Sequence, residues 1–459
     1  MIKTIGLKNF KAFSQLESIE IAPLTIIVGK NSSGKSSILH SLLLLKQTLD
    51  SNNNETALLL EGKYLKYSSL SEIAHNLPTQ ASAKIEYKFE LDSKKKSSIE
   101  LSINNIKNNS SDSNYHPAVA SLKVSIEEKI IDFKKLTLKT LRLAATANEF
   151  SFINELIKET GKKAPIVRFE NFLPKLVEIR TETKGNSKRT VNIPLDLIFD
   201  DYGQQLRNLQ KSIKNIRYLS PVRAMPQRAY IHYSDDTDDL YEDGRNAAHV
   251  FWGKRNEKVT WQGKEYSLIE AVNQCVNCVG LKQKLTPTQT GNIIYQIRVE
   301  IPKKSKDVTI VDVGFGYSQV LPIVLTGLLN KSDNLMLIEQ PEIHLHPSSC
   351  ANLADLFLGF VKDKKHFIIE THSQDFINRL RLRVIENPRL KQQINILFVD
   401  LNDDGTSRVK QFRIDENGSF PEWPSGFIDE SELGARAIIK ARSLSRERQS
   451  KNLSKEKTK

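Results

Sequence analysis

Residues 29–37, Gly-Lys-Asn-Ser-Ser-Gly-Lys-Ser-Ser, constrain the fold of this chain most strongly. They fit the pattern G-x-x-x-x-G-K-[ST], in which a glycine-bearing turn holds phosphate groups. Residues 24–28 before them are apolar and largely β-branched, which predicts a short buried strand. Residues 36–46 after them place leucine and isoleucine on one side, which predicts a helix. We call residues 29–37 the phosphate loop.

A strand, a turn and a helix N-terminus in this order direct several backbone N–H groups at one point, which suits the β- and γ-phosphates of a nucleotide. Lys35 adds a positive charge there, and the Ser36 hydroxyl is suited to hold Mg²⁺. A chance match is the alternative, and the flanking strand and helix argue against it. The residues expected to contact the nucleotide are Asn31, Ser32, Ser33, Gly34, Lys35, Ser36 and Ser37.

The composition of the whole chain limits the class of protein. With 459 residues, 39% hydrophobic and 26% charged, the chain suits a globular protein with two or three domains, or one large core with insertions. Its formal net charge of +13 suits a nucleic acid or another acidic partner. Because the lysines are spread along the chain, a basic, well-solvated surface is an equal alternative.

The chain is expected to be cytoplasmic and without a membrane anchor. It has no apolar run long enough to cross a membrane and no apolar segment of a signal peptide, and its three cysteines make no disulfide framework. Cys275 and Cys278 form a C-x-x-C pair, either half of a zinc site or packing residues on an apolar helix. Packing is favoured, because a zinc site needs about four ligands and Cys350 is the one other cysteine.

Residues 334–347 contain a second informative run. An apolar stretch predicts a central parallel strand, and Glu339, Gln340 and Glu342 follow at its C-terminal end, where α/β sheets place their ligands. A carboxylate at this position reaches the waters on Mg²⁺, which prefers oxygen ligands and keeps part of its hydration. For Glu342, a cap on the following helix is the alternative.

Two further segments end in groups suited to a nucleotide site. Residues 365–373 predict an apolar strand followed by His372, about one helix beyond the previous strand, as in a βαβ unit. Residues 311–322 place Gly316 and Ser318 before an apolar helix, which makes a second helix N-terminus facing outward. A turn and an ordinary helix cap explain this second run nearly as well.

These four segments, together with residues 7–13, resemble ABC-type ATPases of the AAA family with SMC-like or OLD-like heads. The resemblance implies an α/β fold, a P-loop NTPase of the ABC/SMC-head type with a mixed-sheet core and an α+β insertion. It implies that ATP and Mg²⁺ lie between the phosphate loop of one protomer and Gly316 and Ser318 of another. It also implies that His372 contacts the γ-phosphate, and that the chain forms a homodimer or a higher oligomer.

The chain departs from its relatives at the metal and base positions. The relatives usually have aspartate where Glu339 stands and the catalytic glutamate where Gln340 stands. Glu339 is still expected to hold Mg²⁺ with Ser36, whereas the Gln340 amide cannot accept a proton. Three outcomes stay open: Glu342 acts as the base, Gln340 orients water for slow hydrolysis, or ATP is bound with little turnover. Weak or regulated hydrolysis is favoured.

Five parts of the chain are expected. Residues 1–90 are the N-terminal part of the ATPase head, residues 91–215 an α+β insertion, and residues 216–400 the C-terminal part of the head. Residues 401–440 form a small C-terminal domain, and residues 441–459 a basic tail that we expect to be disordered. Heptads do not persist, so no long coiled coil is expected.

The C-terminal segment indicates which branch of these ATPases the chain resembles. Residues 418–430 are similar to a short C-terminal domain of unknown function on one bacterial branch of these ATPases, where the Glu-Gln-Pro-Glu run at 339–342 is ordinary. That branch and its neighbours include ATPase subunits of anti-phage systems of the Septu, retron-associated and PARIS types. The resemblance implies an ATPase that controls a separately encoded nuclease or toxin. The Toprim nuclease residues of OLD proteins are absent, so no nuclease site is expected in this chain.

Two other functions remain as alternatives: an SMC-like DNA-binding repair or recombination ATPase, and a non-hydrolysing scaffold that holds ATP. Nucleic acid is therefore a further candidate partner. Arg223 and Arg228 follow a predicted strand at 216–220. An arginine near a nucleotide site stabilises phosphate charge, but an ordinary ion pair is the favoured interpretation for both.

Overall fold

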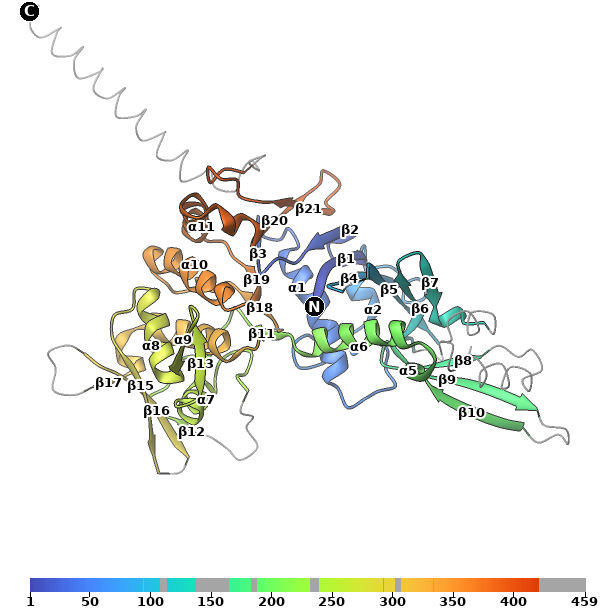
Figure 1. The fold of residues 1–459 in the computed structure, drawn as a ribbon, viewed down its shortest axis with the longest axis horizontal. Coiled ribbons are helices and arrows are strands. Elements are labelled where there is room, and N and C mark those ends of the chain that lie inside the picture. The colour runs from blue at the N-terminus through green and yellow to red at the C-terminus, as the bar shows by residue number, and fades with distance from the viewer. Residues whose placement is uncertain are drawn as a thin grey trace, which may run out of the picture.

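The computed structural model describes residues 1–93, 95–107, 114–137, 165–182, 188–231, 239–291, 293–301, 307–332 and 334–420. A central sheet separates a lobe built mainly of antiparallel strands from a lobe that carries most of the helices (Figure 1). The predicted α/β class with a mixed-sheet core is confirmed. Within the described residues, no helix is both long enough and apolar enough to span a membrane.

The central sheet carries the segments that the sequence singled out. Its strands, in spatial order, are β11 (Arg217–Leu219), β18 (Leu335–Glu339), β19 (His366–Glu370), β3 (Leu24–Gly29), β20 (Ile394–Leu401) and β21 (Ser407–Phe412). All neighbours pair in parallel except β20 and β21. Strands β3 and β18 are buried along their whole length, because both faces of the sheet are covered.

Alternate residues of each central strand enter two different hydrophobic cores. Ile27 of β3 packs toward the antiparallel lobe, whereas Ile26 and Val28 pack toward the helical lobe. Helix α1 (Lys35–Asp50) lies on the first face, and Tyr87 of the antiparallel sheet donates a hydrogen bond to the Ser41 carbonyl of α1 over 3.4 Å. The second face is covered by α9 (Phe315–Leu329), α10 (Pro347–Lys362) and α11 (Gln374–Glu386).

The antiparallel sheet crosses the expected boundary at residue 91. Its strands, in spatial order, are β2 (Phe13–Glu20), β1 (Ile2–Phe10), β4 (Lys84–Leu91), β5 (Ser97–Ile106), β6 (His116–Ile126) and β7 (Lys129–Asp132). The first part of the range 91–215 therefore continues the sheet that the N-terminal strands begin. The separate sheet within this range contains β8 (Ile166–Glu170), β9 (Leu173–Glu182) and β10 (Lys188–Pro194), and α6 (Asp200–Lys214) then packs on α1.

The remaining elements are short or belong to the helical lobe. They are α2 (Leu70–Ile73), η1 (Phe133–Lys135), α5 (Leu195–Ile198), β12 (Tyr230–Ile231), α7 (Ala247–Lys254), β13 (Lys258–Trp261), β14 (Lys264–Ser267), α8 (Leu268–Cys278), β15 (Leu285–Thr290), β16 (Ile294–Val299), β17 (Val308–Thr309), η2 (Ile310–Val313) and η3 (Pro388–Gln392). Cys275 lies in the buried core on α8, and the described residues contain no group of three or more His, Cys, Asp or Glu suited to a metal. The packing interpretation of this cysteine pair is supported.

The range expected to form a small C-terminal domain begins inside the central sheet. The turn at residues 402–405 is closed by a hydrogen bond from Gly405 N–H to the Asn402 carbonyl, 2.9 Å, and it returns the chain as β21 beside β20. Residues 421–440 and the basic tail at 441–459 lie outside the described residues.

Candidate nucleotide site

The phosphate loop connects β3 to α1, and both of its glycines are required by their surroundings. Gly29 has φ 147°, and a β-carbon there would lie 2.0 Å from the Val399 carbonyl oxygen of the neighbouring strand. Gly34 has φ 94°, and a β-carbon there would lie 2.8 Å from side-chain atoms of Ala12 and Ser407. The backbone therefore follows a path that other residues would obstruct, as a loop that wraps a ligand requires.

The positive end of the site is built from Lys35 and the first turn of α1. The Lys35 ammonium group donates to the Gly29 carbonyl at 3.1 Å and to the Lys30 carbonyl at 2.5 Å. Burial lowers the pKa of Lys35, and the negative charge of Glu370 opposes that effect. The first turn of α1 contains no acidic residue, so its N-terminus is suited to an anion.

A pocket of about 580 Å³ joins the phosphate loop to the ends of two other strands. It brings together six residues of the phosphate loop and the side chains that follow β18 and β19. Its lining residues are Lys11, Ala12, Asn31, Ser32, Gly34, Lys35, Ser36, Ser37, His40, Gln340, Glu370 and His372. Ser33 is instead buried beneath the loop, where its carbonyl accepts a hydrogen bond from the Ser407 hydroxyl at 2.6 Å.

Glu370 is a member of this site that the sequence reasoning did not assign. Its Oε2 accepts a hydrogen bond from the Ser36 hydroxyl at 2.8 Å, although the two residues are 334 positions apart. Burial raises the pKa of Glu370, and hydrogen bonding to Ser36 and the charge of Lys35 oppose that rise. The signal was available, because Glu370 ends an apolar strand just as Glu339 does.

Glu339 is buried behind the pocket and is not one of its lining residues. Its Oε1 accepts a hydrogen bond from the Tyr218 hydroxyl at 2.9 Å and lies 3.9 Å from His40 Nε2. Burial, followed by the charge of Glu370, raises the pKa of Glu339 to about 7, and the Tyr218 hydrogen bond opposes this. Burial and the charge of Lys11 lower the pKa of His40 to about 4, so the imidazole is neutral at neutral pH.

The turn that carries Gln340 is fixed from two sides. Gln340 has φ 44°, and its N–H donates to the Glu370 carbonyl at 2.7 Å. The buried Arg223 guanidinium donates to the Glu339 carbonyl at 3.2 Å and to the Gln340 carbonyl at 3.4 Å. Arg223 thus holds the backbone of this turn, whereas Arg228 forms an exposed ion pair with Asp312 at 2.9 Å, as favoured from the sequence.

Glu342 holds the backbone of the His372 loop. Its Oε1 accepts a hydrogen bond from the His372 N–H at 2.7 Å, and burial raises its pKa. Glu342 does not cap α10, because the N-cap residue of that helix is His346, whose side chain accepts from the Ser348 N–H. His372 lines the pocket, and burial, followed by the charge of Lys35, lowers its pKa.

Gly316 and Ser318 do not line this pocket. They lie in the first turn of α9, where the Ser318 hydroxyl donates to the Phe315 carbonyl at 2.8 Å. Gly314, with φ 88°, precedes this helix, and the first turn of α9 contains no acidic residue. The structure therefore brings together the phosphate loop, Gln340 and His372, and leaves the helix N-terminus at Gly316 and Ser318 apart from them.

The side chains of the pocket fit a nucleotide with Mg²⁺. This ion prefers oxygen ligands and is usually held by one or two carboxylates together with water and substrate phosphates. Ser36 and Glu370 supply a hydroxyl and a carboxylate in contact with one another, and Glu339 lies on the strand next to Glu370. The described residues contain no group of three or more His, Cys, Asp or Glu suited to a metal, so phosphate and water oxygens would complete the shell.

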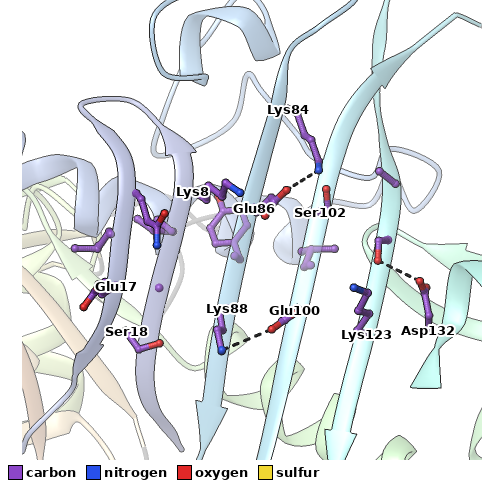
Figure 2. A pocket seen from close by; sticks show the side chains of 18 of the residues that line it. Lys8, Glu17, Ser18, Lys84, Glu86, Lys88, Glu100, Ser102, Lys123 and Asp132 are labelled. Atoms are coloured by element: carbon purple, nitrogen blue, oxygen red, sulfur yellow. Dashed lines mark hydrogen bonds and ion pairs between the residues drawn. The ribbon is translucent and has the colours of Figure 1, made fainter. Parts of the chain in front are cut away.

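A second hollow, of about 600 Å³, lies on the outer face of the antiparallel sheet (Figure 2). Two lysines of β4 pair there with carboxylates of β4 and β5. Lys84 lies 2.5 Å from Glu86, and Lys88 lies 3.6 Å from Glu100. These four charges pair within the sheet, and no residue of the phosphate loop is among the residues that line this hollow.

Three solved structures of SMC heads are similar to this chain. An SMC head bound to the C-winged-helix domain of ScpA is 13% identical, with a TM-score of 0.44, covering 90% of this chain and 98% of that chain. The SMC head domain from Thermotoga maritima is 12% identical, with a TM-score of 0.39, covering 89% and 98%. An SMC head with an extended coiled coil, bound to the C-terminal domain of ScpA derived from Pyrococcus furiosus, is 12% identical, with a TM-score of 0.41, covering 96% and 99%.

No curated protein matches this chain. The family model of the AAA ATPase domain matches residues 1–377, a range that includes every lining residue of the pocket. This match confirms the AAA-family part of the resemblance. Because it spans well over half of the 459 residues, the protein belongs to the AAA ATPase domain family.

Proposed function

We propose that the protein binds ATP with Mg²⁺ in the pocket at the phosphate loop and hydrolyses it slowly. The observation that carries this proposal is the meeting of the phosphate loop, Glu370, Gln340 and His372 around one pocket. Lys35 and the N-terminus of α1 bind the β- and γ-phosphates. Bound Mg²⁺ would neutralise charge on the phosphate oxygens, and His372 is positioned to contact the γ-phosphate.

Gln340 is the residue that we assign to the attacking water. Gln340 lines the pocket, whereas Glu342 does not and accepts a hydrogen bond from the His372 backbone. An amide orients water without removing its proton, which supports slow hydrolysis. We therefore expect Gln340→Glu to raise the turnover rate and Glu342→Gln to leave measurable turnover. Loss of all turnover in Glu342→Gln would make Glu342 the base, and no turnover in the wild type would favour the ATP-holding scaffold.

Lys35→Ala tests the nucleotide site itself. Loss of the ammonium group removes the side-chain charge that faces the phosphates, so we expect ATP affinity to fall by at least about tenfold. Titration calorimetry of the full chain with ATP and Mg²⁺ measures this change. Lys88→Ala is the matched control, because Lys88 pairs with Glu100 on the outer sheet face. Equal affinity in wild type and Lys35→Ala would remove the proposal.

We further propose that two protomers close around ATP and that nucleotide state controls a separately encoded effector in anti-phage defence. Gly316 and Ser318 start a helix with no acidic first turn and lie outside the pocket of their own chain, which suits contact with a nucleotide held by another protomer. The resemblance to anti-phage ATPase subunits supports a nuclease or a toxin as the effector. Copurification with the product of a neighbouring gene, dependent on ATP and absent in Lys35→Ala, tests this partner.

A basic cleft favours nucleic-acid binding as a second candidate function. The cleft has a volume of about 930 Å³ and lies between the C-terminal ends of α1, α6 and α9. Its lining contains four carboxylates, Asp50, Asp239, Glu242 and Glu257, and more cations than carboxylates. The cations are Lys46, Lys63, Lys211, Lys214, Arg217, Lys254 and Lys331.

The affinity of this cleft for nucleic acid should depend on the salt concentration. We expect affinity for duplex DNA to fall steeply with salt, and the double variant Lys211→Glu/Lys214→Glu to reduce both affinity and salt slope. The double variant Lys84→Glu/Lys88→Glu on the outer sheet face is the control. Absence of DNA binding at low salt would exclude this second function and leave the ATP site untouched.

A further inference from the structure

Two acidic residues lie next to each other at the ends of β18 and β19, but their side chains have different neighbours. Glu339 and Glu370 are partners in the parallel pairing of these strands. Residues in register on neighbouring parallel strands project toward the same face of a sheet, about 5 Å apart. Glu370 lines the nucleotide pocket, whereas Glu339 lies behind it.

The contacts of Glu370 point to the metal side of the site. Its Oε2 accepts from the Ser36 hydroxyl at 2.8 Å, and that hydroxyl is the group the phosphate-loop pattern assigns to Mg²⁺. The Glu370 backbone carbonyl accepts from Gln340 N–H at 2.7 Å, which joins the two strand ends. The Glu370 side chain is therefore held at Ser36, and its backbone is held by the turn after β18.

The Glu339 side chain has Tyr218 and, at 3.9 Å, His40 of the pocket as neighbours. Its Oε1 accepts from the Tyr218 hydroxyl at 2.9 Å, and Tyr218 lies on β11, on the far side of β18 from β19. Within the described residues, the Glu370 side chain accepts a hydrogen bond from Ser36 of the phosphate loop. The Glu339 side chain accepts its hydrogen bond from Tyr218 instead. The carboxylate nearest the expected metal position is thus the one on β19.

The charge count of the site supports the same assignment. Gln340, which follows Glu339 at the end of β18, is neutral, so this strand end carries one acidic side chain. Glu370 adds a second acidic side chain from the neighbouring strand. Mg²⁺ is commonly bound through one or two carboxylates plus phosphates, so two acidic groups at this edge are sufficient.

We propose that Glu370, beside Ser36, is the carboxylate that binds the Mg²⁺ shell of bound ATP, and that Glu339 is a supporting residue behind it. The assignment rests on the proposed ATP site and deepens it. The sequence pattern predicted Glu339 as the carboxylate that binds the metal, and this proposal assigns that role to Glu370.

The test compares nucleotide affinity with and without the metal. The dissociation constant of a fluorescent ATP analogue is measured on the full chain in excess Mg²⁺ and in EDTA. In wild type, Mg²⁺ is expected to strengthen binding. We define the ratio as the dissociation constant in EDTA divided by that in Mg²⁺. In Glu370→Gln, this ratio should fall by about 10–100-fold. The constant in EDTA should stay equal or become tighter, because a negative charge next to the phosphates has been removed.

Matched variants separate this role from a structural one. Glu100→Gln removes a carboxylate that pairs with Lys88 on the outer sheet face, and it should keep the wild-type ratio. Glu339→Gln should lower the ratio less than Glu370→Gln does. If Glu370 only supports the phosphate loop, Glu370→Gln weakens binding equally in both conditions, and that result overturns the proposal.

Failure of the proposal is distinguishable from failure of the ATP site. If wild type binds no nucleotide in either condition, the ATP site itself is wrong. If wild type shows the metal dependence and Glu370→Gln keeps it, the assignment of Glu370 is wrong. Circular dichroism checks the fold of each variant. Should Glu370→Gln not fold, Glu370→Ala also removes the carboxylate, and the same fall in the ratio is expected. An unchanged wild-type ratio in that variant would contradict the proposal.

Discussion

Glu339 couples the stability of the nucleotide-free protein to pH. Its pKa rises from an ordinary value of 4.5 to about 7 in the folded protein, first because it is buried and second because Glu370 lies near it. Between these pH values the folded state keeps a proton that the unfolded state has released. The contribution of Glu339 to the free energy of unfolding therefore falls as pH rises from about 4.5 to about 7.

Glu339→Gln removes this titrating group and keeps an oxygen that accepts from Tyr218. Without nucleotide or metal, we expect the variant to lose this contribution, which amounts to roughly 3 kcal/mol between low and neutral pH. Denaturant unfolding at a series of pH values measures it. An unchanged pH slope in the variant would show that Glu339 titrates normally in the folded protein.

Arg223 illustrates what a residue contributes without touching the ligand. Its guanidinium is buried and donates to the carbonyls of Glu339 and Gln340. Burial lowers its pKa to about 10, so it keeps its charge at neutral pH. From the sequence an ordinary ion pair was the favoured interpretation, because nothing local indicates that a side chain after β11 reaches the turn after β18. That contact depends on the parallel pairing of the two strands.

At the scale of elements, the phosphate loop depends on the close approach of β3 and β20. Gly29 pairs with Val399, and a β-carbon on Gly29 would meet the Val399 carbonyl at 2.0 Å. We expect Gly29→Ala to lower the free energy of unfolding by about 1–3 kcal/mol and to weaken ATP binding, because the strands must move apart. Thermal unfolding and ATP titration test both effects.

Gly253→Ala is the control for that substitution. Gly253 lies inside α7, and a β-carbon there would meet nothing within 4 Å. Alanine is favoured over glycine within a helix, so this variant should keep ATP affinity and gain up to about 1 kcal/mol. If Gly29→Ala behaves like Gly253→Ala, the close approach of the two strands is not needed for the loop.

Most of the site-bearing elements could be predicted from the sequence, but their order in the sheet could not. The strand expected at 24–28 is β3, Leu24–Gly29, and the helix expected at 36–46 is α1, Lys35–Asp50. Apolar runs and a glycine pattern are local signals. The position of β19 between β18 and β3 is a property of the whole sheet, and it is what brings Glu370 to Ser36. For the same reason, the sequence did not indicate that β5 and β6 extend the N-terminal sheet.

At the scale of the whole molecule, the separation of Ser318 from the pocket leads to a prediction about assembly. If a second protomer supplies Gly316 and Ser318, ATP promotes dimer formation in a protein that hydrolyses slowly. Ser318→Arg should prevent this dimer, because a long cation replaces a nearly buried hydroxyl in the first turn of α9. Sedimentation velocity with and without ATP measures the dimer.

ATP binding by the monomer separates assembly from folding in that experiment. Ser318 does not line the pocket of its own chain, so Ser318→Arg should still bind ATP with an affinity within a few fold of wild type. Ser332→Arg is the matched control, because Ser332 is exposed just beyond the opposite end of α9, and this variant should keep the ATP-dependent dimer. An ATP-dependent dimer of Ser318→Arg would exclude this surface from the interface.

The most direct test of the account is the position of the metal in a complex. Crystals of the full chain grown with a non-hydrolysable ATP analogue and Mn²⁺ in place of Mg²⁺ reveal the ion by its anomalous scattering. We predict one peak next to Ser36 and Glu370, with the analogue's phosphates against residues 29–37. A nucleotide bound elsewhere, or an ion that contacts neither side chain directly nor through water, would contradict the account.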